Sequence, residues 1–167
     1  MMRFVLVAMI AALGAVGAAK ALDAMLPAPA ASAPHAAVAL AAQDASSPAE
    51  IAKSADGHFW AWAEVDGHPV EFLVDTGSTA VALTADDARR LGIDPGGLNY
   101  SYNVATANGE AHAAEVELAS IEVAGVREDN VQAFVIDHGL PTSLLGMSYL
   151  GRLSEFSATP SELILKP

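Results

Sequence analysis

The sequence of 167 residues contains no cysteine. This absence excludes disulfide bonds, thiolate zinc sites, thiol catalysis and a lipid-modified cysteine anchor. Basic residues are few as well: residues 51–167 contain 17 acidic and 6 basic residues, a net charge of −11 with histidine neutral. So acidic a surface repels phosphate backbones, and we expect no nucleic-acid partner. None of the five histidines has H-x-x-x-H spacing, so we expect neither a metal ion nor another cofactor.

The N-terminus has the pattern of an export segment. Arg3 precedes an unbroken run of 16 apolar or glycine residues, 4–19, and Ala19-Lys20-Ala21 fits the small-x-small cleavage rule. A helix of this length spans about 24 Å, less than the ~30 Å hydrocarbon core, whereas further apolar residues as far as position 26 would lengthen it. We interpret residues 1–26 as either a cleaved signal peptide or a membrane anchor, in which residues 4–26 form the tether. Both readings place the protein in the periplasm or cell envelope.

The remainder divides into a linker and one domain. Residues 27–50 are rich in alanine, proline and serine and contain no aromatic residue, which is typical of a flexible or partly extended linker. Residues 51–167 hold the bulky apolar residues, enough to bury a sizeable core. We therefore expect a single folded domain over residues 51–167.

Short alternating segments in this domain predict a mainly β fold. Asp66-Gly67 and Asn108-Gly109 are hairpin-turn signals. Thr84 is a good N-cap for a helix over residues 85–91, and Thr142 or Ser143 is expected to begin a brief helix that ends at Leu150. Many short strands with one or two small helices indicate a compact barrel or sandwich. The predicted strands cover residues 58–65, 69–74, 80–83, 100–105, 111–118, 121–123, 131–136 and 162–165.

The chemistry centres on one carboxylate. Asp75 directly follows the apolar run Phe72-Leu73-Val74. Gly77 permits a sharp turn, and the hydroxyls of Thr76 and Ser78 lie close by, so hydrogen bonds can hold the acid rigidly at the strand end. As a bare tripeptide, D-T-G is usually only a turn. A second segment, LLGMSYL over residues 144–150, strengthens the interpretation because two bulky residues, a glycine and a short helix follow about 70 residues later.

These segments resemble the bacterial, single-domain, N-terminally anchored branch of the retropepsin-like aspartic proteases. The resemblance covers about residues 57–166 and rests on FLVDTGSTAVALT, RRLGI, VATANGEA, NVQAFVI and LLGMSYL. It implies a mainly β, retropepsin-like acid-protease barrel with one or two short helices, one lobe per chain, that works as a homodimer on a polypeptide substrate. It also implies that Asp75 is catalytic, that Thr76, Gly77, Ser78, Leu145 and Gly146 support the active-site loop, and that Thr106, Ala107, Asn108 and Gly109 form a flap over the substrate.

One copy of D-T-G per chain predicts that Asp75 faces Asp75 of a second chain. Peptide hydrolysis without a metal or nucleophile needs a base to activate water and an acid to protonate the amide, and two carboxylates that share one proton supply both, as in aspartic proteases generally. Ser78 stands where viral members often have alanine, and its hydroxyl is expected to bond the carboxylate and favour ionisation.

Two further interpretations stay open beside an exported aspartic endopeptidase. One is a catalytically inactive, dimeric peptide- or protein-binding module of the same fold in the envelope. The other is a monomeric structural domain, which would leave the pairing of D-T-G with apolar-apolar-glycine unexplained. The intact D-T-G favours the enzyme.

Overall fold

The computed structural model describes residues 48–167; the predicted leader (1–26) and residues 27–47 of the predicted linker lie outside the described residues. The secondary structure of the described part is almost entirely β, as the sequence predicts. Its elements are β1 (Ala49–Ala52), β2 (Trp60–Val65), β3 (His68–Val74), β4 (Val81–Leu83), α1 (Ala85–Arg90), a 3-10 helix (Pro95–Gly97), β5 (Tyr102–Thr106), β6 (Gly109–Val123), β7 (Val126–Ile136), β8 (Ser143–Leu145), α2 (Met147–Leu150), β9 (Glu155–Ala158) and β10 (Glu162–Lys166).

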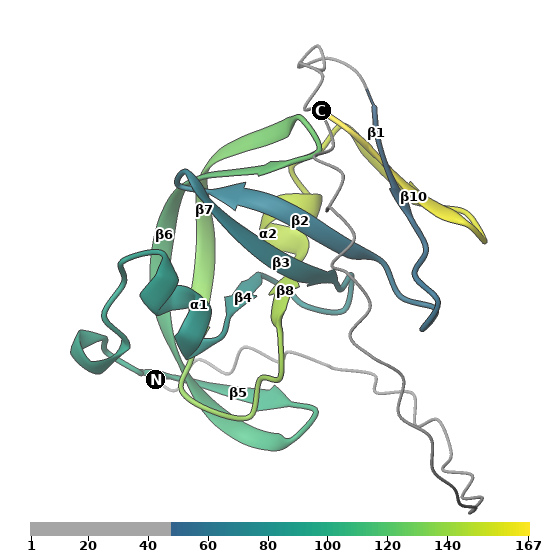
Figure 1. Ribbon diagram of the computed structural model, residues 1–167. Coiled ribbons are helices and arrows are strands. Elements are labelled where there is room, and N and C mark those ends of the chain that lie inside the picture. The colour runs from purple at the N-terminus through teal and green to yellow at the C-terminus, as the bar shows by residue number, and fades with distance from the viewer. Residues whose placement is uncertain (1–47) are drawn as a thin grey trace, which may run out of the picture.

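Six strands close into a barrel. They pair in the order β2-β3-β8-β4-β7-β6, and β6 pairs back to β2 through Ala63↔Val123 and its neighbours. β5 adds to the free part of β6, so that the β5–β6 hairpin projects from the barrel at the bottom of Figure 1. This architecture confirms the predicted fold class of a mainly β barrel with two short α helices.

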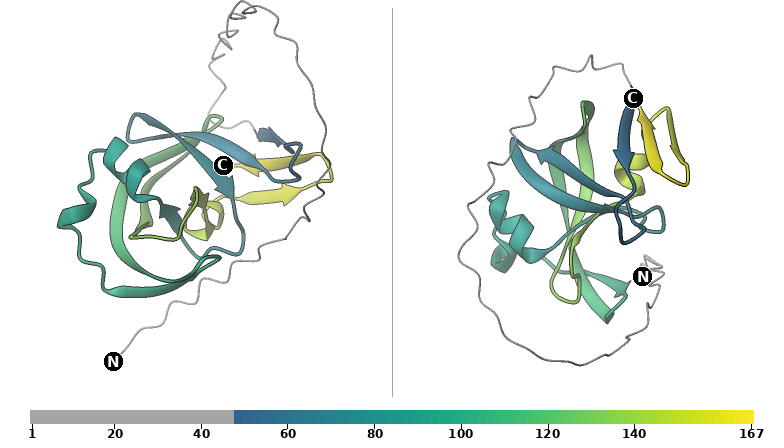
Figure 2. Two further views of the ribbon diagram at one scale, coloured as in Figure 1. Left: turned by 60° about the horizontal axis from the view of Figure 1, so that its bottom comes forward. Right: turned by 45° about the vertical axis from the view of Figure 1, so that its right-hand side comes forward.

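A separate three-stranded sheet lies beside the barrel. Its strand order is β1-β10-β9, and Figure 2 shows it at one side of the barrel in both views. Ile51 of β1 and Leu163 and Leu165 of β10 are buried in the main core, which fixes the sheet against the barrel. Because β1 begins at Ala49, which is buried, the folded part starts within the segment predicted as linker.

The longest strands differ from their prediction. Residues 111–118 and 121–123 were expected as two strands, but both belong to the 15-residue β6, which forms a long hairpin with β7. Its turn is Ala124-Gly125, with φ of 49° and 88°. Buried residues recur along both strands, among them Leu118, Ile121, Val131 and Val135, which are fully buried. The ladder between β6 and β7 runs from Ala113↔Ile136 to Val123↔Val126 and pairs the backbone on both sides of the expected break, which stabilises a single long strand.

The segment before α2 is a strand, so the predicted helix from Thr142 or Ser143 is wrong in its first half. Ser143–Leu145 forms β8, which runs parallel to β3 and pairs with β4 only at Ala82↔Leu144. The helix α2 begins at Met147 with Gly146 as its N-cap. All three β8 residues are buried, and insertion between two barrel strands supplies the backbone partners that the local sequence does not reveal.

No helix among residues 48–167 is long and apolar enough to cross a membrane.

Candidate active site

Asp75 lies on the turn that leaves β3, where the sequence predicts the acid. Its N–H donates to the Leu145 carbonyl (3.1 Å), and its own carboxylate accepts the Gly77 N–H at Oδ1 (2.8 Å). The Ser78 N–H closes the turn on the Asp75 carbonyl (3.2 Å). Asp75 is partly exposed, whereas Thr76 and Gly77 are exposed. The carboxylate is therefore oriented by its own loop and remains accessible to water.

The second predicted segment packs directly beneath this loop. Leu145 pairs with Val74 in the parallel β3–β8 ladder and provides the carbonyl that holds Asp75. The next residue, Gly146, is so close to the chain after Asp75 that a Cβ built on it would lie 2.2 Å from the Ala80 oxygen and 2.9 Å from the Ser78 oxygen. The Met147 N–H donates to that same Ser78 oxygen (2.9 Å). Leu145 and Gly146 thus contact the Asp75 loop, as the sequence predicts.

The expected bond from the Ser78 hydroxyl to the Asp75 carboxylate is absent. The Ser78 side chain is 1% exposed and points into the fold, where its hydroxyl donates to the Ala80 carbonyl (2.7 Å). Burial explains this difference: a buried hydroxyl must find an acceptor, and the carbonyl of the buried Ala80 lies within reach, whereas Asp75 is partly exposed. Ser78 therefore braces the backbone of the loop and does not bond the acid.

Residues 106–109 form the tip of the β5–β6 hairpin, where the sequence places a flap. The Thr106 hydroxyl donates to the Gly109 carbonyl (2.9 Å) and accepts the Asn108 N–H (3.2 Å). The Asn108 side chain also donates to the carbonyl of Gly139, in the β7–β8 loop (3.0 Å). Ala107 and Asn108 are exposed. The tip is thus held to a neighbouring loop rather than projecting freely.

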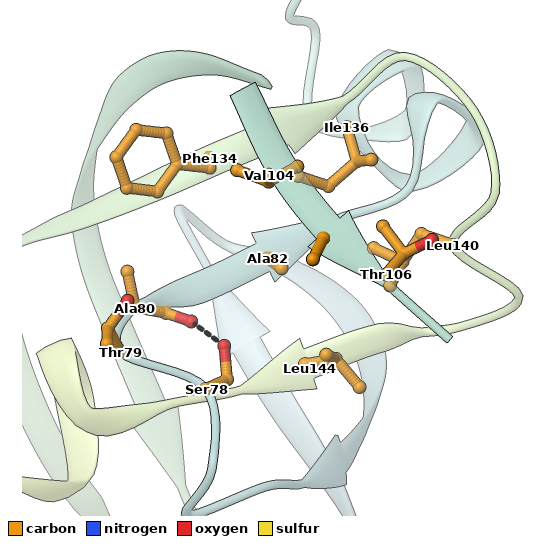
Figure 3. A pocket seen from close by; sticks show the side chains of 11 residues that line it. Ser78, Thr79, Ala80, Ala82, Val104, Thr106, Phe134, Ile136, Leu140 and Leu144 are labelled. Atoms are coloured by element: carbon orange, nitrogen blue, oxygen red, sulfur yellow. Dashed lines mark hydrogen bonds between the residues drawn. The ribbon is translucent and has the colours of Figure 1, made fainter. Parts of the chain in front are cut away.

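A hollow lined mainly by apolar residues separates this hairpin from the active-site loop. Figure 3 shows its lining side chains, with Ser78, Thr79 and Ala80 of the active-site loop at one end and Thr106 of the hairpin at the other. Among the side chains that line it, none carries a charge; the other residues are Ala82, Val104, Ala105, Phe134, Ile136, Leu140 and Leu144. Many of them belong to a small second core to which β4, β5, β6, β7 and β8 contribute. The sequence did not reveal this hollow, because its lining comes from strands that are distant in the chain.

A set of polar contacts at the base of the hairpin, which we call the polar tie, has no signal in the sequence. Both the His112 N–H (2.9 Å) and the His138 N–H (2.8 Å) donate to Oδ1 of Asp137, and the Asp137 N–H donates to the His112 carbonyl (3.0 Å). Burial acts to raise the pKa of Asp137, but the two N–H donors and the His138 side chain outweigh it and hold that pKa below its ordinary value. The tie joins the start of β6 to the end of β7.

Within residues 48–167, no group of three or more histidine, aspartate or glutamate side chains is arranged to hold a metal ion.

Comparison with known proteins identifies the family. A family model described as "gag-polyprotein putative aspartyl protease" matches residues 61–152, which contain both predicted motifs. The chain belongs to the retropepsin-like aspartic proteases. A solved structure of a retropepsin-like aspartic protease from Rickettsia conorii is 41% identical, covers 71% of this chain and 98% of its own, and superposes with a TM-score of 0.66.

Two curated relatives are uncharacterized proteins. One, in the cobV 5′ region of a Sinorhizobium species, is 43% identical over 117 residues, and these cover 70% of this chain and 50% of the relative. The other, from Rickettsia prowazekii, is 44% identical over 115 residues, covering 69% of this chain and 49% of the relative. The chain thus spans about half the length of the curated relatives it matches. Family and fold together support a protease or protease-like function.

Proposed function

We propose that this protein is an exported aspartic endopeptidase that hydrolyses peptide bonds through a dyad formed by Asp75 of two chains. The observation that carries the proposal is the single, partly exposed Asp75 on a loop fixed from below by Leu145 and Gly146. One such loop per chain supplies one acid, so a second copy of the chain completes the site. The single-lobe fold shared with the Rickettsia conorii protease supports this assembly.

In the proposed mechanism a water molecule lies between the two carboxylates. Like charges about 3 Å apart do not both ionise readily, so the pair shares one proton and titrates as a unit. The ionised Asp75 takes a proton from the water, which attacks the scissile carbonyl carbon. The protonated Asp75 donates its proton to the carbonyl oxygen, which gives a gem-diol intermediate. The Asp75 that took the proton from water then donates it to the amide nitrogen, while the other Asp75 takes back a proton from a gem-diol hydroxyl. The C–N bond breaks, and no metal or covalent intermediate takes part.

The substrate in this proposal is an extended polypeptide between the active-site loop and the β5–β6 hairpin. The hollow beside Ser78 and Ala80 has a volume of only about 20 Å³, so it would contact an uncharged side chain of that polypeptide rather than enclose it, and none of its own lining side chains carries a charge. The tip at residues 106–109 would cover the bound segment as a flap. Export by residues 1–26, with the protein free in the periplasm or tethered to the membrane, completes the proposal.

A proteolysis assay on the full-length chain tests the catalytic assignment. Wild type is compared with Asp75→Asn and with Asp129→Asn, the same substitution at a solvent-exposed carboxylate that pairs only with Arg127. An unfolded protein such as casein and a library of short peptides serve as substrates. We expect Asp75→Asn to fold normally and lose cleavage, and Asp129→Asn to retain it. A folded wild type that binds peptides without cleaving any would favour the inactive binding module.

A further inference from the structure

A polar cluster centred on two buried residues, Asp87 and Ser143, lies at the ends of β4 and β8 that are remote from the active-site loop. We call Thr84, Asp87, Arg90 and Ser143 the Asp87 cluster. Oδ2 of Asp87 accepts the hydroxyls of Ser143 (2.6 Å) and Thr84 (3.0 Å), and Oδ1 accepts Nη1 of Arg90 (2.9 Å). Asp87 is 9% exposed and Ser143 is fully buried. None of these residues takes part in the proposed chemistry.

Helix capping explains only part of this cluster. Thr84 is the N-cap of α1, and its hydroxyl oxygen accepts the Asp87 N–H (3.1 Å). That exchange lies within one turn and needs no other element. Ser143 lies 56 residues further along the chain, in β8, and its hydroxyl oxygen also accepts the Thr84 N–H (3.1 Å). The serine therefore links the end of β4 and the start of α1 to the first residue of β8.

This link lies where the strand ladder is weakest. β4 and β8 contain three residues each and pair only at Ala82↔Leu144. On the active-site side of that pair, Gly146 packs on Ala80, and the Met147 N–H bonds the Ser78 carbonyl. On the other side, the Asp87 cluster is the remaining polar connection between the two strands. β3 pairs with all three residues of β8, but the single contact between β4 and β8 does not by itself fix β8 along β4. The connections at the two ends of that pair therefore help to set its position.

A change in the position of β8 would be transmitted to the Asp75 loop through only a few residues. Ser143 is two residues from Leu145, whose carbonyl accepts the Asp75 N–H. A shift of β8 along β4 would displace that carbonyl and move Gly146 against Ala80, where there is no spare room. Either movement would turn the Asp75 backbone, and with it the carboxylate.

We propose that Asp87 and Ser143 are positioning residues for the active site, which hold β8 in register with β4 so that Leu145 and Gly146 keep Asp75 in place. This inference rests on the proposed function. The pair touches no reacting atom: Asp87 is the acceptor that orients the Ser143 hydroxyl, and Ser143 is the contact that orients β8.

The test compares the two adjacent aspartates of α1. Asp87→Asn keeps the size of the side chain but turns a carboxylate that accepts three donors into an amide with only one acceptor oxygen. Asp86→Asn is the matched control, because Asp86 lies in the same helical turn, is exposed and pairs with Arg89. In the folded protein we expect Asp87→Asn to lower kcat about tenfold and to leave KM little changed. A tenfold loss is smaller than the loss of about 10²-fold that a misplacement of catalytic groups by about 1 Å causes. Asp86→Asn should leave both constants unchanged.

A second variant and a second readout separate positioning from stability. Ser143→Ala removes the hydroxyl that links the strands and leaves the α1 cap intact, and it should lower kcat in the same way. NMR amide signals of Asp75 and Gly77, recorded well below the unfolding temperature, should shift in Asp87→Asn and Ser143→Ala but not in Asp86→Asn. If both cluster variants unfold at a lower temperature yet keep wild-type kcat and wild-type signals, the cluster is only structural and the inference is refuted.

The NMR readout needs no activity. If wild type cleaves nothing, the proposed function fails while the amide signals still decide whether the cluster positions Asp75. Unchanged signals would then overturn the positioning role by themselves.

Discussion

Replacing Gly146 by alanine probes the contact between the two motifs most directly. The backbone of Gly146 has an ordinary φ of −99°, so its conformation does not require glycine. The close approach of another chain segment does: a Cβ would lie 2.2 Å from the Ala80 oxygen, whereas ordinary contact begins at 3.4 Å. The Ala80 carbonyl would have to retreat by about 1.2 Å into a packed core, since protein interiors offer few voids. Such a shift would also disturb the Ser78 carbonyl, which the Met147 N–H bonds.

The expected magnitudes follow from that displacement. Overpacking of this kind costs about 1–3 kcal/mol, and the weakened Met147–Ser78 hydrogen bond adds about 1 kcal/mol. We therefore expect Gly146→Ala to lose about 3 kcal/mol of unfolding free energy and to melt on the order of 10 °C lower. Because a misplacement of about 1 Å costs about 10²-fold in rate, kcat/KM should fall by a similar factor in the protein that stays folded.

Thermal unfolding and peptide cleavage, measured on the same samples, check both numbers. Gly97→Ala is the control, because its Cβ would meet only the Asp94 carboxylate at an ordinary 3.5 Å. That variant should behave as wild type. A Gly146→Ala protein with unchanged melting temperature and activity would show that Gly146 does not pack against the Asp75 loop.

Three further predictions concern assembly, specificity and acid stability. Specific activity should fall when the protein is diluted below the dissociation constant of the dimer. An excess of Asp75→Asn should inhibit wild type, because most wild-type chains would then be in heterodimers. A protein that is monomeric by ultracentrifugation and keeps full specific activity would refute the shared dyad. Ala82→Val should narrow the hollow lined by Ala82. In the variant that stays folded, a peptide series should show kcat/KM reduced about tenfold for large side chains but not for small ones; equal losses for both would exclude the hollow as a contact for substrate side chains. The pKa of Asp137 lies below its ordinary 3.8, so the ionised carboxylate stabilises the fold at any pH above 3.8. The unfolding free energy of wild type should therefore exceed that of Asp137→Asn by its full amount at neutral pH. This difference should disappear as the pH falls through the lowered pKa. Denaturant unfolding across the pH range checks this, and a difference independent of pH would contradict it.

Local signals were sufficient wherever a structure is built from neighbours in the chain. Asp66-Gly67 predicts a two-residue hairpin turn, and both residues adopt positive φ (49° and 80°) between β2 and β3. Thr84 predicts a helix start, and it accepts the Asp87 N–H as an N-cap does. In each case the residues that determine the local structure lie within a few positions of one another, so the local sequence is enough to predict it.

Prediction failed where the partners are distant. Residues 142–145 have a serine and a threonine ahead of a helix, which favours an N-cap. Ser143 nevertheless opens a strand, because Phe72 of β3 pairs with it and Ala82 of β4 pairs with the next residue, Leu144. β9 went unpredicted for the same reason, since β10 supplies its ladder. The Ser78 hydroxyl was assigned to the wrong acceptor because a sequence shows which groups are close along the chain but not which way a side chain points.

Two motifs were needed to predict the site, because the Asp75 loop is fixed by a segment that is distant in the chain. Taken alone, the turn after β3 holds the Asp75 carboxylate only through the Gly77 N–H and its own closure by Ser78. The Leu145 carbonyl holds the backbone of the acid itself, and Gly146 and Met147 hold the segment that follows it. Because residues 145–147 contact this turn, it has less conformational freedom than an isolated tripeptide. Such preorganisation is what a reaction that develops charge requires of its catalytic groups. The D-T-G sequence therefore indicates a rigid acid only in combination with the apolar-apolar-glycine segment that packs beneath it.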